Sequence, residues 1–378
     1  MEVFATTTGA NPASRFIQVE SRYIKVHLEV SSQRLAAKSP MNAQTQKPNI
    51  LISEVGPRDG LQSISQTMPT AAKLRWIAAL ADAGLREIEV GSFVSPKLLP
   101  QMADAAQVVE GAINIPGLTV LALVPNLKGA ERAVAAGVHK LTMPVSASRQ
   151  HSLSNIGKTP EDAIAEVGRV RAFLDAFPQN LPHDLPHNLA LARRPGLEVG
   201  ISTAFGCTME GPVPEDRVIE MAGLLAKAGA DSVGLSDTTG YANPVQVKRM
   251  FKRLFAEIGE KAGGAHLHNT RGQGLANVVA ALDAGVTTFD SSQGGLGGCP
   301  YAPGATGNIV TEDLVFLLES MGLSTGIDIG KLIAARTVVQ ATLPGEPMYG
   351  HVPDAGLPKG FVPAALRHID RTSAGPMT

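Results

Sequence analysis

The sequence has few cysteines, almost no net charge and no long hydrophobic run. Two cysteines in 378 residues do not make a disulfide framework, which indicates a reducing compartment. The formal net charge of -1 gives no reason to expect nucleic acid or a membrane surface as a partner. No apolar run approaches the roughly 18 to 20 residues that a membrane helix needs. Hydrophobic residues at 44% instead indicate a globular protein with a large core.

Residues 1–48 differ from the rest of the chain. They contain an isolated alternating stretch, FIQVESRYIKVHLEV, followed by a polar stretch, and they lack the apolar core of a signal peptide. Several arginines and hydroxyl residues fit a transit peptide, whereas Glu2, Glu20 and Glu29 argue against one. We therefore interpret residues 1–48 as a loosely ordered extension. The expected location is cytoplasmic, or mitochondrial if this leader is a transit peptide.

From residue 49 onward, short apolar runs alternate with longer helical patterns. Strands are predicted at 49–55, 85–92, 118–124, 138–145, 197–205, 230–237, 264–270 and 286–293. Helices are predicted at 70–84, 127–137 and 160–177, and near 98–110, 214–229, 243–258, 272–284 and 311–322. Eight strand–helix units match a (β/α)8 TIM barrel, which typically has about 250 residues. A doubly wound sheet, which uses the same units, is the alternative.

The barrel is assigned to residues 49–345. The C-terminal residues 346–378 are rich in Pro and Gly and are interpreted as a short, loose tail. A Pro- and Asn-rich insertion, 178–196, falls between a helix and the next strand and is interpreted as a solvated loop.

Barrel enzymes place their working residues at the C-terminal ends of the strands, so these ends are the first place to search. The first strand runs into GPRDG, which contains Arg58 and Asp59. This pair is either a solvated ion pair in a turn, or a metal carboxylate beside a guanidinium that holds an oxyanion. The second strand carries Glu87 and Glu89 on one face. The one that points inward needs a cationic partner, and Arg58 on the adjacent strand is the obvious candidate.

Later strand ends carry more polar side chains. Asp237 in GLSDTTG is either a helix cap or a functional acid. His266 and His268 in HLHNT lie two residues apart, so both point to one side of a strand, as half of a metal site or as a pair of core histidines. Asn308 closes a glycine-rich loop and offers a neutral oxygen. Two His, one Asp and one Asn suit Mg²⁺ or Mn²⁺, with Zn²⁺ or Co²⁺ as substitutes.

Seven motifs, taken in order, resemble one known family. They are EVGPRDGLQ, SFVSPKLLPQM, PNLKG, FGC…EG, SDTTG, HLHNTRGQGLAN and GGLGGCPYAPGATGN. Together they resemble the 3-hydroxy-3-methylglutaryl-CoA (HMG-CoA) lyases, metal-dependent acyl-CoA lyase barrels, over residues 49–345. The resemblance implies four metal ligands: Asp59, His266, His268 and Asn308. It also implies a substrate-binding Arg58, an active-site thiol at Cys299, supporting acids at Glu89 and Asp237, and a role in proton transfer for His266.

The reaction implied by the resemblance is a retro-Claisen cleavage of HMG-CoA, or of a close 3-hydroxyacyl-CoA, to acetyl-CoA and acetoacetate. His266 or Asp237 is the candidate base. Cys299 is predicted to be an acid that a glycine-rich lid delivers. The expected partners are an acyl-CoA substrate and a second copy in a homodimer, with no nucleic acid and no membrane. Two positions depart from the family pattern: Asn269 replaces the usual Asp of HxHDT, and Gly91 lies where Thr is common.

Other functions are compatible with the same pattern. A condensing synthase shares the barrel and the two histidines, but usually carries a further C-terminal domain. A lyase for another branched hydroxyacyl-CoA and an aldolase for a hydroxy-oxo acid are close alternatives. A non-haem iron oxygenase would also use two His and one Asp, and would depend on iron and O₂. A non-catalytic, metal-stabilised barrel would leave the thiol unexplained.

Overall fold

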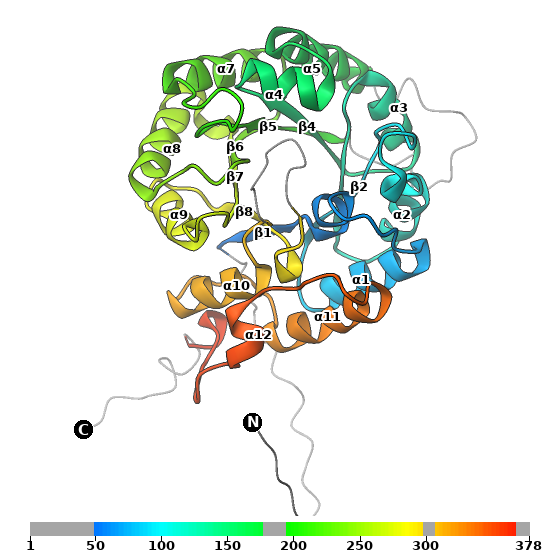
Figure 1. Cartoon of the computed structure of the whole chain (residues 1–378), viewed down its shortest axis with the longest axis vertical. Helices are drawn as coiled ribbons and strands as arrows, with labels where there is room; N and C mark the ends of the chain where they lie inside the picture. The colour runs from blue at the N-terminus through cyan, green and yellow to red at the C-terminus, as the bar shows by residue number, and fades with distance from the viewer. Residues whose placement is uncertain (1–48, 177–193, 298–306, 368–378) are drawn as a thin grey trace, which may run out of the picture. The chain divides into compact units, whose positions relative to one another are not determined.

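Eight parallel strands form the centre of the structure, a computed structural model that describes residues 49–176, 194–297 and 307–367. The strands follow one another around a closed barrel (Figure 1). β1 pairs with β8, so that Leu51 lies beside Thr288. Closure confirms the predicted (β/α)8 barrel, because a doubly wound sheet would have two free edges. The strands are β1 (Leu51–Glu54), β2 (Glu87–Ser92), β3 (Thr119–Leu123), β4 (Lys140–Ser146), β5 (Gly196–Ser202), β6 (Ser232–Asp237), β7 (Ala262–Leu267) and β8 (Thr288–Ser291).

Helices surround the barrel and follow the strands in sequence (Figure 1). Every predicted helix is present, with ends that differ by a few residues. Local capping explains where several begin; the Thr159 side chain, for example, accepts the Asp162 backbone N–H at the start of α5. The helices that match predictions are α1 (Thr70–Asp82), α2 (Ala105–Ala112), α3 (Leu127–Ala135), α5 (Pro160–Asp175), α7 (Glu215–Lys227), α8 (Pro244–Ile258), α9 (Gly274–Leu282) and α10 (Thr311–Ser320).

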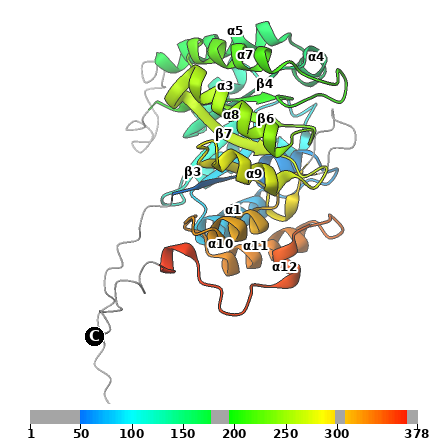
Figure 2. The same cartoon turned by 90° about the vertical axis from the view of Figure 1, so that its left-hand side faces the viewer.

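Other helical elements were not predicted from the sequence. They are α4 (Arg149–Ile156), α11 (Ile329–Thr342), α12 (His351–Ala355) and the short turns η1 (Gly56–Gly60), η3 (Gly259–Lys261) and η4 (Gln293–Gly295). The helix predicted near 98–110 is divided into the short turn η2 (Pro100–Met102) and α2. α10, α11 and α12 gather on one side of the barrel beyond α1 (Figure 2). α11 packs against α1, which gives the barrel an extra helix there.

The C-terminal segment makes specific contacts as far as the described residues reach, although its composition suggests a loose tail. The His351 and Val352 N–H groups donate to the Asp313 carboxylate at 2.9 and 2.8 Å. The Ala364 N–H donates to Glu319 at 2.6 Å. Buried carboxylates of α10 thus hold residues 351–364, a signal that proline and glycine content does not reveal.

The barrel interior is polar, whereas the core lies between the strands and the helices. In β4, Leu141, Met143 and Val145 belong to that apolar core. Lys140 and Thr142, on the opposite face, bond to side chains of β2 and β5 inside the barrel. Bulky branched residues usually fill a TIM barrel, so charged residues here indicate that the interior serves chemistry. No helix in the described ranges is long and apolar enough to cross a membrane.

Candidate active site

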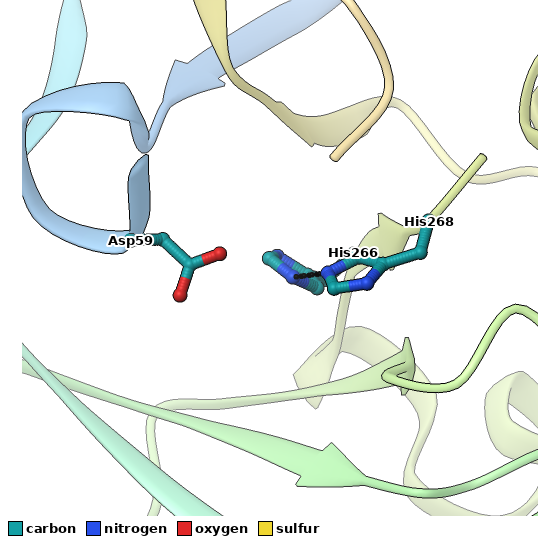
Figure 3. Close-up of side chains that lie close together, drawn as sticks. All are labelled: Asp59, His266 and His268. Carbon is teal, nitrogen blue, oxygen red and sulfur yellow. Dashed lines mark hydrogen bonds between the residues drawn. The ribbon is translucent and has the colours of Figure 1, made fainter. Parts of the chain in front are cut away.

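Three predicted metal ligands meet at the C-terminal mouth of the barrel. Asp59 lies in η1, directly after β1, His266 lies in β7, and His268 follows the end of β7. One carboxylate oxygen and one nitrogen from each histidine all lie within 4.8 Å of one another. Figure 3 shows the Asp59 carboxylate directed toward the two imidazoles. Because the strands are parallel, their ends bring together residues that are more than 200 positions apart in the sequence.

The fourth predicted ligand, Asn308, closes this cluster. Its side-chain N–H₂ donates to Asp59 Oδ2 at 2.7 Å, and its backbone pairs with His268. Its side-chain oxygen is buried and has no hydrogen-bond partner within the described residues. A buried oxygen without a partner is costly unless a cation or water satisfies it. The structure thus brings all four predicted ligands together.

The two imidazoles are arranged as ligands of one ion would be. His266 Nε2 and His268 Nε2 lie 3.1 Å apart, close to the spacing of about 3 Å between adjacent ligands that each bind at about 2.1 Å. On its other side, His266 Nδ1 contacts Asp290 Oδ2 at 3.0 Å. This carboxylate favours a proton on Nδ1 and leaves Nε2 free to coordinate. Burial lowers the pKa of His268 to about 4, so that imidazole is neutral at pH 7. The donor set therefore fits a divalent cation.

Arg58 is fixed by two carboxylates beside the cluster. Its Nε donates to Glu89 Oε2 at 2.5 Å and its Nη1 donates to Asp59 Oδ1 at 2.6 Å. The expected pairing of Arg58 with Glu89 is confirmed. The Thr142 hydroxyl donates to the other Glu89 oxygen. Burial opposes ionisation of Asp59, yet Arg58 and the two histidines hold the pKa of Asp59 below its ordinary value. Arg58 Nη2 has no hydrogen bond within the described part of the chain, so it can face a ligand.

Asp237 makes the structural turn contact that the sequence offered as one alternative, and its role as a functional acid stays a prediction. Its Oδ1 accepts the N–H groups of Tyr241 and Ala242 at 2.8 and 3.2 Å, which is a structural turn contact. Its Oδ2 is buried with no partner in the described ranges. Burial raises the pKa of Asp237 to about 6. It pairs in register with Leu267, the residue between the two histidines. Asp237 thus places a readily protonated carboxyl at the edge of the site.

The two departures from the family pattern have local explanations. Asn269 Oδ1 accepts the N–H of Gly274, the first residue of α9, at 3.0 Å, and no hydrogen bond joins its side chain to a histidine among the described residues. Asn provides this acceptor as well as Asp does. A side chain at Gly91 would meet Ala105 of α2 at 3.2 Å, which means that this position faces the helix layer and not the site.

Several residues that contact the candidate site residues were not predicted from the sequence. Asp290, which orients His266, lies in a predicted strand but has no local motif; its register opposite His266 could have revealed it. Gln62 donates to Asp59 Oδ1 at 2.8 Å, and Thr142 supports Glu89. Cys299, the predicted acid, lies outside the described residues.

Comparisons with known proteins agree with this geometry. The HMGL-like family model matches residues 49–339. The hydroxymethylglutaryl-CoA lyase of Bacillus subtilis (strain 168) is 39% identical over 299 residues, which cover 79% of this chain and 94% of that protein. The mitochondrial hydroxymethylglutaryl-CoA lyase of Macaca fascicularis is 39% identical over 305 residues, which cover 81% and 89%.

A similar solved structure is that of an HMG-CoA lyase from Acinetobacter baumannii in complex with coenzyme A and 3-methylmalate. It has a TM-score of 0.74 and 38% sequence identity, and the match covers 83% of this chain and 97% of that one. The family model spans more than half of the chain, and two lyases exceed 30% identity over most of it. The chain therefore belongs to the HMGL-like family.

Proposed function

We propose that this chain is a carbon–carbon lyase that cleaves HMG-CoA to acetyl-CoA and acetoacetate. The observation that carries the proposal is the convergence of Asp59, His266 and His268 beside a fixed Arg58. Relatives that are 39% identical bear the name of this activity. The alternative functions have no comparable support, since relatives and solved structures that are 38 to 39% identical to this chain are named as HMG-CoA lyases.

The cofactor in this proposal is a divalent cation, Mg²⁺ or Mn²⁺. Asp59, His266, His268 and Asn308 would hold it, because their mixed oxygen and nitrogen donors include no thiolate. When bound, the cation would lower the pKa of the substrate's tertiary hydroxyl and offset the charge that develops on its oxygen. Asp290 keeps His266 in the tautomer that coordinates, and Gln62 and Asn308 steady the Asp59 carboxylate.

Arg58 is assigned to the substrate carbonyl. The carbon–carbon bond breaks so that one fragment leaves as a ketone, acetoacetate, and the other as the enolate of acetyl-CoA. Because Glu89 and Asp59 hold two of the Arg58 nitrogens, its Nη2 can point at the enolate oxygen without any reorganisation. This pre-formed donor stabilises the negative charge as it develops.

Proton transfer is assigned to groups near the edge of the site. Of the two predicted bases, Asp237 accepts the hydroxyl proton, because His266 faces Asp290 through Nδ1 and holds the cation through Nε2. The enolate carbon must later gain a proton, so no net proton is consumed. A pKa of about 6 makes Asp237 largely ionised at pH 7 and thus able to act as the base. The assignment of Cys299 as the acid stays a prediction. Cys299→Ser with unchanged kcat in reducing buffer would remove it.

The substrate class is an acyl-CoA ester. A related lyase of known structure contains coenzyme A together with 3-methylmalate, a small hydroxy diacid. A free carboxylate and a tertiary hydroxyl on the acyl group suit a metal centre beside a guanidinium. The homodimer and the cytoplasmic location also stay predictions; size-exclusion chromatography with light scattering tests the first.

The deciding experiment measures acetyl-CoA release from HMG-CoA. We expect turnover with Mg²⁺ or Mn²⁺, and its loss with EDTA. Asp59→Asn should lower kcat/KM at least about 100-fold, because it removes the anionic ligand. Asp82→Asn is the matched control, since Asp82 is 71% exposed and forms a surface ion pair. Turnover that survives complete metal removal, or an Asp59→Asn variant equal to the control, would contradict the proposal.

A further inference from the structure

A second layer of charge lies inside the barrel, toward the N-terminal ends of the strands. Lys140 at the start of β4 donates to Glu87 of β2 at 2.7 Å and to Glu198 of β5 at 3.2 Å. These groups are not part of the ligand cluster. Asp290 of β8 links the two layers, because it contacts His266 and its charge also acts on Glu198.

The two layers together carry more carboxylates than permanent cations. Among the described residues of the interior, five carboxylates share two cations, Arg58 and Lys140: Asp59, Glu87, Glu89, Glu198 and Asp290. Arg58 forms ion pairs with Asp59 and Glu89, and Lys140 forms ion pairs with Glu87 and Glu198. Within the described residues, the Asp290 carboxylate pairs only with the His266 imidazole. Asp59, Glu87 and Glu89 are buried, whereas the Glu198 and Asp290 side chains are 22% and 24% exposed. Such an excess of negative charge inside a barrel is unfavourable unless protons or a bound cation offset it.

Glu198 is the member of the cluster best placed to take up a proton. It shares Lys140 with Glu87, and its contact is the longer of the two. The charged groups that face it are Lys140 of β4, Glu87 of β2 and Asp290 of β8. Burial, followed by the charges of Asp290 and Glu87, raises the pKa of Glu198 to about 7 despite the attraction of Lys140. It therefore binds a proton at neutral pH far more readily than an ordinary glutamate does.

We propose that Glu198 is the proton-linked counter-charge of the metal centre, releasing its proton when a divalent cation binds at Asp59, His266 and His268 and recovering it when the cation leaves. This inference rests on the metal site of the proposed function. A divalent cation adds positive charge to the same barrel interior, and Asp290, which contacts the ligand His266 and acts electrostatically on Glu198, links the two positions. Added positive charge favours the ionised form of a carboxylate. The coupling is electrostatic and needs no movement of the chain. By linkage, metal affinity must then rise with pH through the range in which Glu198 titrates.

The test counts protons by isothermal titration calorimetry. Mn²⁺ is titrated into metal-free protein at pH 7 in buffers of different ionisation enthalpy, which gives the number of protons released per ion. If binding lowers the pKa of Glu198 by about one unit, wild type should release about 0.4 proton more than Glu198→Gln. Ligand histidines contribute equally to both proteins, so the difference isolates Glu198. Glu161→Gln, at a 69% exposed carboxylate, is the control and should match wild type.

A second readout is the dissociation constant of Mn²⁺ between pH 6 and pH 8. The affinity should rise more steeply with pH in wild type than in Glu198→Gln. Lys140→Met gives an independent check, because loss of the Lys140 ammonium raises the pKa of Glu198 and moves the pH of greatest proton release upward.

Equal proton counts in wild type and Glu198→Gln, with Mn²⁺ still bound, overturn this inference and leave the lyase proposal intact. If Mn²⁺ does not bind at all, both fall. If the proton difference is present and HMG-CoA is not cleaved, the lyase proposal alone fails.

Discussion

Arg58 illustrates how single residues are positioned in this site before any substrate arrives. The Asp59 and Glu89 carboxylates accept hydrogen bonds from Arg58, and the Thr142 hydroxyl donates to Glu89. We expect Arg58→Lys to lower kcat about 100- to 1,000-fold, because an ammonium cannot keep both carboxylate contacts and still present a third donor. Steady-state kinetics measure this change. Arg149→Lys, at an exposed ion pair, is the control. A variant at Arg58 that keeps half of the wild-type kcat would rule out this role for its guanidinium.

For single residues, the sequence predicted the members of the candidate metal site and missed the side chains that support them. His266 and His268 are two residues apart on a predicted strand, and Asp59 follows the end of another strand. The histidine pair and Asp59 can therefore each be recognised from the sequence around them. Asp290 is a lone acid in a strand, and its partner is 24 residues away. The Lys140–Glu198 pair spans 58 residues. Such contacts depend on strand register and barrel closure, which no local pattern encodes.

At the scale of elements, Glu54 ties three of them together. Its Oε1 accepts the N–H groups of Gly56 and Gln293, both at 2.8 Å, and its Oε2 contacts the Thr311 hydroxyl at 2.7 Å. These contacts join the end of β1 to η4 and to α10. Burial raises the pKa of Glu54 to about 8, so it is mostly neutral at pH 7. It therefore acts as a buried hydrogen-bonding group more than as a charge.

We expect Glu54→Gln to lower the free energy of unfolding by less than about 1 kcal/mol at pH 7, since a neutral amide keeps the shape and the acceptor oxygen. Glu54→Ala should cost about 3 kcal/mol, because it leaves two buried N–H groups without a partner. Urea denaturation followed by circular dichroism measures both, with Glu131→Ala as an exposed control. If the Gln and Ala variants were equally destabilised, the charge of Glu54 and not its hydrogen bonds would be what matters.

Comparing the helices and strands shows which of them apolar periodicity in the sequence predicts and which it does not. The eight strands and the helices with clear caps could be predicted because their apolar patterns are regular. α4 was missed because RQHSLSNI has no apolar stripe, and its start depends on the Ser148 side chain accepting the His151 N–H at 3.1 Å. The π-helical turn η1, which carries Arg58 and Asp59, follows from Gly and Pro geometry and from contacts with η4 that the sequence does not reveal.

At the scale of the whole molecule, two carboxyl groups with raised pKa values make stability depend on pH and on metal. Glu54 and Glu198 have folded-state pKa values of about 8 and about 7, above an ordinary value of 4.5. Between pH 4.5 and these values, the native state binds protons that the unfolded state does not, so stability falls as pH rises.

We expect metal-free protein to lose about 2 to 3 kcal/mol of unfolding free energy from pH 6.5 to pH 8, measured by urea denaturation. The double variant Glu54→Gln/Glu198→Gln should lose much less over this range. Saturating Mn²⁺ should also reduce the loss, because the bound cation favours ionised Glu198 and binds the native state alone. Stability of the metal-free wild type that stays constant or rises from pH 6.5 to pH 8 would show that these two carboxyls are already ionised, and that the interior tolerates its excess charge without protons.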